Sequence, residues 1–281
     1  MRTVFPTELI FNEYGSAREG TILFLHANSY SAKLYRPFLE PFRDDYEILS
    51  PDLPGHGDSR WSGRIQNWND LADYYIEMID KNPPQSPLVG MGHSIGGVLT
   101  LIMAIKRPQW FSKIILLDPV MLPRRILWVI RVLRIFSLTH LVPLAKTSKR
   151  RKQHFPSLEA ALEHYSNKAV FAQWQPEFRQ AYVDTCIHAT ESGQYQLSCA
   201  PELESSIYQS IPLQVWSLPK KLTIPSLFII GENSDTVNQH GLLRLKRLGG
   251  NHVVKSIDGG HLFPFEKPAR CIDMIKEFLA E

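Results

Sequence analysis

A serine between glycines is the residue of this chain whose setting best fits a nucleophile. Ser94 lies in the stretch Gly92-His93-Ser94-Ile95-Gly96, after a short apolar run and before a helix-like run. This order predicts a sharp strand-to-helix turn, in which small residues let the strand and the helix come close. Such a turn strains the backbone and holds the hydroxyl out at the edge of a sheet. The hydroxyl could then attack a carbonyl carbon, provided that a base takes its proton.

Two residues near the carboxyl terminus could activate this serine. His261 lies in the glycine-flanked sequence DGGHLFP, and Asp235 comes four residues after Gly231. Each follows a predicted strand, and loops at the carboxyl ends of parallel strands open on the same edge of a sheet. The chain order predicts a triad with Ser94 as nucleophile, His261 as general base and Asp235 as the acid that orients the imidazole.

Acyl transfer also needs two fixed N–H donors for the oxyanion that forms on the carbonyl oxygen. We expect one donor to be the backbone N–H of Ile95, at the start of the helix that follows Ser94. The other should come from the loop HANS, directly after the apolar run 21–26.

The elements that must position these residues alternate between strand and helix. Apolar runs typical of strands buried on both faces occupy 21–26, 46–52, 87–92, 113–119, 225–231 and 252–257, and helical patterns occupy 32–43, 67–81, 94–106, 239–248 and 264–280. This alternation predicts an α/β fold with a doubly wound, mostly parallel sheet.

The alternation is interrupted between residues 121 and 219, where helix-like patterns occur without a convincing strand run. We therefore predict a mainly helical cap over 121–219, inserted into a core domain formed by 1–120 and 220–281. An insertion at this point would cover the carboxyl edge of the sheet, where ligands bind in open α/β folds.

Five motifs in this order resemble the α/β-hydrolase superfamily along essentially the whole chain: LHANSY, DLPGHGDS, GHSIGG, GENSDTV and GHLFPFEKP. The resemblance implies a capped serine hydrolase and makes the backbone N–H of Asn28 the second oxyanion donor. Two positions depart from the usual pattern, because Ala27 replaces a glycine and Asp235 comes one residue late. Some members keep the acid after the strand that follows the nucleophile, which makes Asp118 the alternative acid.

Several side chains are candidates for the pocket. His93 is expected to pack beside the nucleophile without a chemical role. The aromatic candidates for the lining are Trp128, Phe136, Phe171, Trp174 and Tyr208, although any of them could instead belong to the core.

The stretch 123–136, PRRILWVIRVLRIF, mixes arginines with bulky apolar residues, and KTSKRRK follows it at 146–152. Arg124, Arg131 and Arg134 could share one face of a helix. A basic amphipathic helix with a tryptophan can lie on an anionic bilayer. The other interpretation is a cap helix with its apolar side over the site and its arginines in water. We favour the cap helix, because a cap must cover an apolar pocket in any case.

The composition limits the other function classes. A net charge of +3 is too small to indicate nucleic acid as a partner, and the chain has no nucleotide-binding glycine motif. Three cysteines without CxxC spacing predict reduced thiols and no metal site. The first residues lack the pattern of a signal peptide, so we expect a cytoplasmic location. We expect no cofactor, and the oligomeric state stays open.

Together these features predict a carboxylesterase-like enzyme that cleaves an ester, or a thioester, of a small or medium apolar acyl group through an acyl-enzyme. A carbon–carbon bond hydrolase or a cofactor-free perhydrolase could use the same triad. From another class, a non-catalytic protein could bind a ligand in the same pocket.

Overall fold

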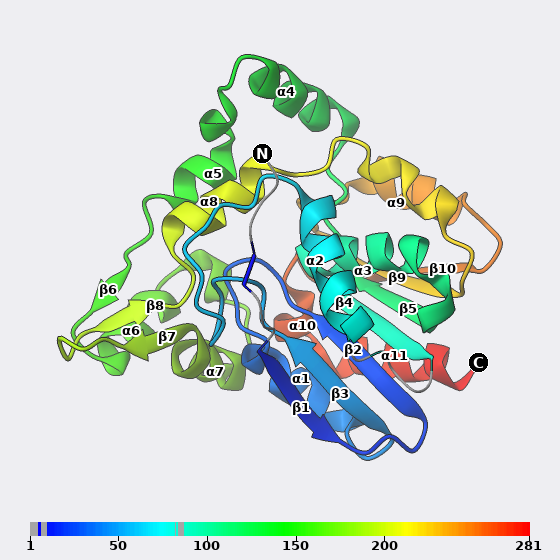
Figure 1. Ribbon diagram of the computed structural model, residues 1–281, viewed down its shortest axis with the longest axis horizontal. Coiled ribbons are helices and arrows are strands. Elements are labelled where there is room, and N and C mark those ends of the chain that lie inside the picture. Colours follow the sequence, from blue (N-terminus) through cyan, green and yellow to red (C-terminus); the bar gives the residue numbers. More distant parts are fainter. Residues whose placement is uncertain (1–4, 7–9, 82, 84–86) are drawn as a thin grey trace.

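The computed structural model describes residues 5–6, 10–81, 83 and 87–281. A seven-stranded sheet with the order β1-β3-β2-β4-β5-β9-β10 forms the centre of the molecule (Figure 1). Its strands are β1 (Phe11–Gly15), β2 (Gly20–Leu25), β3 (Tyr46–Pro51), β4 (Leu88–His93), β5 (Phe111–Leu117), β9 (Ser226–Gly231) and β10 (His252–Ile257). Strand β1 is antiparallel to β3, and the other neighbours are parallel. The predicted mostly parallel sheet is confirmed, and each of the six predicted strands is part of it.

Helices cover both faces of the sheet. The helices outside the β5–β9 connection are α1 (Arg36–Leu39), α2 (Trp68–Lys81), α3 (Ile95–Lys106), α9 (Gln239–Lys246), α10 (Phe263–Glu266) and α11 (Pro268–Ala280). Two predicted helices are each divided. Short 3-10 turns flank α1 in the predicted helix 32–43, where Pro37 and Pro41 occur, and Pro268 separates α10 from α11. Proline lacks the N–H that continues a helix, which accounts for these divisions.

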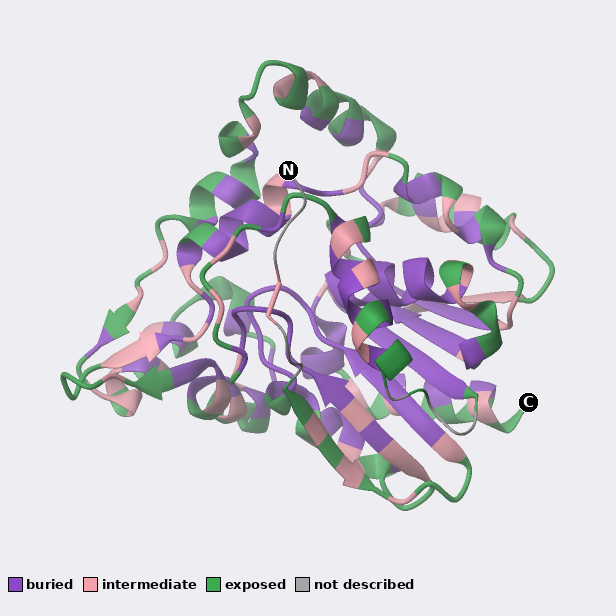
Figure 2. Ribbon diagram, in the orientation of Figure 1, coloured by how far each residue is buried: buried purple, intermediate pink, exposed green. Residues whose placement is uncertain are grey.

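The inner strands β2, β4, β5 and β9 are largely buried on both faces, as their apolar composition requires (Figure 2). In β5, Ile114 and Leu116 belong to the core cluster that includes α2 and α3, whereas Ile115 and Leu117 belong to the cluster that includes α1 and α11. Within the described residues, no helix combines the length and the apolar character that crossing a bilayer requires.

The connection between β5 and β9, residues 118–225, lies beside the carboxyl edge of the sheet (Figure 1). Its helices are α4 (Arg124–Ile135), α5 (Pro143–Ser148), α6 (Leu158–Ser166), α7 (Pro176–Cys186) and α8 (Pro201–Gln209). It also contains an antiparallel sheet of three short strands, β6 (His154–Phe155), β8 (Tyr195–Leu197) and β7 (Ile187–Ala189). The sequence did not predict these strands, because two or three residues are too few to establish an alternating pattern. The boundaries 121 and 219 of a cap domain stay a prediction.

Candidate active site

Ser94 lies in the turn between β4 and α3. Its backbone has φ 59° and ψ −119°, a left-handed conformation that is strained for a residue with a side chain. A Cβ atom at Gly92 would lie 2.4 Å from the carbonyl group of Gly96, and one at Gly96 would lie 2.0 Å from the carbonyl oxygen of Leu25. Only glycine fits at these two positions, so the sequence pattern and the tight turn have the same physical cause.

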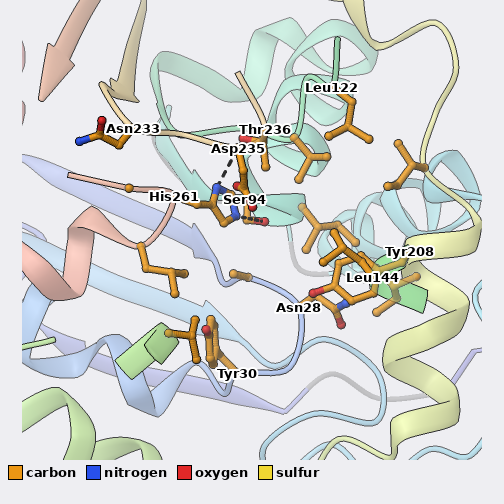
Figure 3. A pocket seen from close by; sticks show the side chains of 18 of the residues that line it. Asn28, Tyr30, Ser94, Leu122, Leu144, Tyr208, Asn233, Asp235, Thr236 and His261 are labelled. Carbon is orange, nitrogen blue, oxygen red and sulfur yellow. Dashed lines mark hydrogen bonds between the residues drawn. The ribbon is translucent and has the colours of Figure 1, made fainter. Parts of the chain in front are cut away.

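The loop between β10 and α10 brings His261 to this serine. Nε2 of His261 lies 2.9 Å from Oγ of Ser94, and Nδ1 lies 2.6 Å from Oδ2 of Asp118 (Figure 3 shows the Ser94 contact). Because a carboxylate can only accept, Nδ1 of His261 carries the proton, and Nε2 accepts from the Ser94 hydroxyl. This tautomer is the one that a general base for Ser94 requires.

The structure contradicts the choice of Asp235 as the partner of His261 and places the alternative, Asp118, there. The reason lies in the turn after β9. Ser234 and Thr236 both donate hydroxyl hydrogen bonds to Oδ2 of Asp118, at 2.6 and 2.7 Å. Asp235 lies between these two residues, is exposed, and lines a cavity. The sequence contained one indication of this arrangement. Ser234 and Thr236, on either side of Asp235, carry hydroxyl groups that can donate to a carboxylate from another strand, here that of Asp118.

The electrostatic surroundings favour the charged form of His261. Burial lowers the pKa of His261, but the hydrogen bond and the charge of Asp118, with the charges of Asp235 and Glu266, outweigh it and raise the pKa above its ordinary value. Asp235 thus acts on the imidazole through its field, without a direct contact.

The residues that carry the two expected oxyanion donors, Asn28 and Ile95, line the same cavity. Ile95 is the first residue of α3, so its backbone N–H has no acceptor within the helix. Asn28 follows β2, and both residues line the cavity at Ser94. The Asn28 side chain donates to the backbone carbonyl of Glu204 on α8, at 3.3 Å. A residue of the β5–β9 connection therefore helps to hold this loop.

Buried histidines brace the loops around the site. His26 donates through Nδ1 to the carbonyl of Ala27 and accepts at Nε2 from the N–H of Leu53, both at 2.8 Å. Burial, with a contribution from the charge of His56, lowers the pKa of His26 to about 3, so the ring is neutral.

His93 has a more direct link to the site than packing alone. Its Nε2 donates to the backbone carbonyl of His261 at 2.8 Å, and its Nδ1 accepts from the hydroxyl of Tyr35 at 2.6 Å. Burial and the charge of His261 lower the pKa of His93 to about 3, which keeps this ring neutral. The Tyr35 hydroxyl also accepts from the N–H of Ala27 at 3.4 Å. Tyr35, which the sequence did not indicate, thus joins the oxyanion loop to the His261 loop.

A cavity of about 570 Å³ opens over Ser94 (Figure 3). Its apolar lining includes Trp68, Ile95, Val120, Leu122, Leu144, Ile207 and Ile211, with Tyr30 and Tyr208. Its polar lining includes Gln173, Asn233, Asp235, Thr236 and Glu266. In Figure 3, Asn233 and Asp235 lie at the His261 end of the cavity, and Leu144 and Tyr208 lie at the other end.

Of the pocket candidates, Tyr208 lines this cavity and the others do not. His93, Phe171 and Trp174 are buried, and the last two belong to an aromatic cluster behind Tyr30. Trp128 and Phe136 are exposed at 66% and 67%. The spacing of the aromatic residues in the sequence could not distinguish those that line the cavity from those that are buried elsewhere or exposed, because this depends on the path of the β5–β9 connection.

Buried ion pairing supports the wall of the cavity near α8. The Arg151 guanidinium donates to the carboxylate of Glu204 and to the hydroxyl of Tyr182. The side chain of Glu204 is only 7% exposed. Within the described part of the chain, no three His, Cys, Asp or Glu side chains gather in a way that could hold a metal ion.

Comparison with known proteins agrees with this geometry. The model of the alpha/beta hydrolase family matches residues 22–274. The chain belongs to the alpha/beta hydrolase family. Lipase LipV of Mycobacterium tuberculosis is 23% identical over 274 residues, which cover 97% of this chain and 98% of that protein. An uncharacterized hydrolase of Bacillus subtilis, YugF, is 30% identical over 116 residues, which cover 41% of this chain and 42% of that protein.

Solved structures of other alpha/beta hydrolases share the fold. E-2-(acetamidomethylene)succinate hydrolase has a TM-score of 0.79 at 18% identity, with 100% of this chain and 98% of that chain covered. The thioesterase domain from the curacin biosynthetic pathway has a TM-score of 0.75 at 17% identity, with 96% of this chain and 99% of that chain covered. At these identities the likeness shows the fold alone.

Proposed function

We propose that this alpha/beta hydrolase is a serine hydrolase that cleaves a carboxylic ester, or a thioester, through an acyl-enzyme. The observation that carries the proposal is the continuous hydrogen-bonded path from Ser94 through His261 to Asp118, with 2.9 Å at one end and 2.6 Å at the other. It has the geometry of a nucleophile, a general base and an orienting carboxylate.

The reaction follows from the positions of these groups. Ser94 Oγ attacks the carbonyl carbon while His261 Nε2 takes the hydroxyl proton, and Asp118 stabilises the resulting imidazolium. The N–H groups of Asn28 and Ile95 stabilise the oxyanion. His261 then gives the proton to the leaving alcohol or thiol. Water, activated by His261 in the same way, hydrolyses the acyl-enzyme and releases the acid.

The lining of the cavity supports an apolar acyl group of small or medium size. A cavity of about 570 Å³ with mostly apolar walls favours an acyl chain over a charged acid. The relatives include a lipase, and the structural neighbours include a thioesterase, which agrees with ester or thioester substrates.

A fluorophosphonate probe with a panel of p-nitrophenyl esters tests the proposal. The wild-type protein should be labelled at Ser94 and should hydrolyse apolar short- and medium-chain esters, and Ser94→Ala should lose both properties. A folded wild-type protein that is neither labelled nor active on any ester would contradict the proposal and would favour a non-catalytic ligand-binding protein.

A further inference from the structure

The positive charge of the protein is concentrated in one part of the β5–β9 connection. Residues 119–158 contain nine Lys and Arg and no Asp or Glu, whereas the rest of the chain contains 22 Lys and Arg against 28 Asp and Glu. The net charge of +3 therefore combines a strongly basic segment with an acidic remainder. Such a segment favours an anionic partner.

Helix α4, within this segment, turns its apolar side chains to solvent. Only Leu127 and Ile130 of α4 are buried, whereas Trp128 and Ile135 are 66% and 71% exposed, and Phe136, directly after the helix, is 67% exposed. Figure 2 shows α4 at the top of the molecule with its outer side coloured as exposed. The residues of α4 do not line the cavity over Ser94, which differs from the expected position of the apolar side of this helix. A cluster of large exposed apolar side chains on one helix is typical of an interaction surface.

A basic groove lies beside this helix. It has a volume of about 360 Å³, its lining includes Arg124, Arg131, Lys220 and Arg244, and no carboxylate is among its lining residues. Within the described residues, none of these four cations forms an ion pair with a carboxylate. Burial lowers the pKa of Arg244, and the charge of Arg124 lowers it further. Like charges without a counter-ion repel one another, so an anion in this groove would be stabilised.

Further exposed apolar side chains occur after α4 in the sequence. Leu138 and Leu141 follow α4 and are exposed at 38% and 47%. Leu144 and Val170 are exposed at 45% and 51%, and both line the cavity over Ser94. Leu138, Leu141 and Leu144 therefore link α4 to the cavity lining along the chain.

We propose that α4 and the groove beside it dock the protein on the surface of an anionic phospholipid bilayer. Trp128, Ile135 and Phe136 enter the interface, and the cations of the groove bind lipid phosphates. An apolar helix face flanked by arginines is the pattern of a helix that lies in a membrane interface. A soluble phosphate would leave the apolar face unused, and a second copy of the chain on the same face would bring two basic segments together. The proposal goes beyond the proposed hydrolysis and does not depend on it.

Sedimentation with vesicles tests this docking on the 281-residue chain with Ser94→Ala, in which hydrolysis plays no part. We expect binding to phosphatidylcholine vesicles that contain phosphatidylglycerol, no binding to pure phosphatidylcholine vesicles, and weaker binding at high salt. Arg124→Gln with Arg244→Gln should weaken binding about 25-fold, because each removed charge near an anionic membrane costs about fivefold. Trp128→Ser with Phe136→Ser should weaken binding as well.

A matched control removes two exposed cations from α11, which lies away from α4 (Figure 1). Arg270→Gln with Lys276→Gln changes the net charge by the same amount and should alter binding less than about twofold. Equal loss in both double variants, equal binding to both vesicle types, or no binding to either would overturn the proposal. Self-association that Trp128→Ser abolishes, without vesicle binding, would also overturn it and would assign the surface to a second copy of the chain.

Discussion

At the scale of single residues, Ser94 and Asp118 share a positive φ, which is unusual for residues other than glycine. Both have positive φ, 59° and 39°, and they follow the neighbouring strands β4 and β5. Each such conformation costs about 1–3 kcal/mol in the folded state. For Asp118 the cost is offset by donors to its carboxylate, from the Gly231 N–H, the hydroxyls of Ser234 and Thr236, and His261. This concentration of donors on one buried carboxylate is why Asp118, and not Asp235, orients the imidazole.

The first prediction concerns this carboxylate. Asp118→Asn should lower kcat by about 10³- to 10⁴-fold, because an amide oxygen stabilises the imidazolium poorly and an amide N–H favours the wrong tautomer. Asp235→Asn should lower kcat less than about tenfold, since that residue makes no hydrogen bond to His261. Steady-state kinetics on one p-nitrophenyl ester compares the two variants. A larger fall in Asp235→Asn would contradict the geometry.

The second prediction concerns the pH profile. His261 acts only when it is unprotonated, and its pKa is raised, so kcat/KM should rise with pH through an inflection above the ordinary value of 6.5. Removing the Asp235 charge destabilises the imidazolium, so Asp235→Asn should move this inflection to lower pH. Because Asp235 is exposed, high salt should have the same effect on the wild type. An inflection that moves to higher pH in Asp235→Asn would contradict the assigned direction.

At the scale of elements, the β5–β9 connection is tied to the sheet edge through α8. The backbone carbonyl of Glu204 accepts from the Asn28 side chain at the sheet edge. The Glu204 carboxylate pairs with Arg151 within the connection. Arg134 of α4 also donates to the backbone carbonyls of Gln209 and Ile211. Arg134 is therefore an anchor of α4 and does not belong with Arg124 and Arg131 on the docking surface.

The third prediction tests the buried pair. Arg151→Met should lower the free energy of unfolding by about 3–5 kcal/mol, because it leaves the Glu204 carboxylate buried without its cation. The double variant Arg151→Met with Glu204→Leu should regain most of that loss, since no charge is then left unpaired. Urea unfolding measures both values. A double variant no more stable than Arg151→Met would show that the pair is not the cause.

At the scale of the whole molecule, the sequence patterns predicted the parallel sheet and the turns at Ser94 and His261. They did not predict the features that depend on individual side-chain contacts. The six predicted strands could be recognised because each is a short run rich in apolar residues. Ser94 and His261 could be recognised because glycines flank both residues. Whether Asp118 or Asp235 contacts His261 depends on the directions of the side chains in the turn after β9. Knowing that both residues follow strands does not determine these directions. The outward apolar face of α4 was not predictable, because an amphipathic pattern does not say which face meets the protein.

The last prediction joins the two proposals through the substrate. If α4 holds the protein on an anionic bilayer, a long-chain ester in phosphatidylglycerol-containing vesicles reaches the cavity from the docked state, and its hydrolysis depends on docking. Arg124→Gln with Arg244→Gln should then lower the rate on the vesicle ester by about the factor lost in binding, about 25-fold. The same variant should hydrolyse a water-soluble short-chain ester at the wild-type rate, because neither residue lines the cavity at Ser94. Parallel assays of both esters, with Arg270→Gln plus Lys276→Gln as the control, measure the difference. An equal fall in the hydrolysis rate of both esters would indicate damage to the fold. An unchanged rate on both esters would show that hydrolysis does not depend on docking.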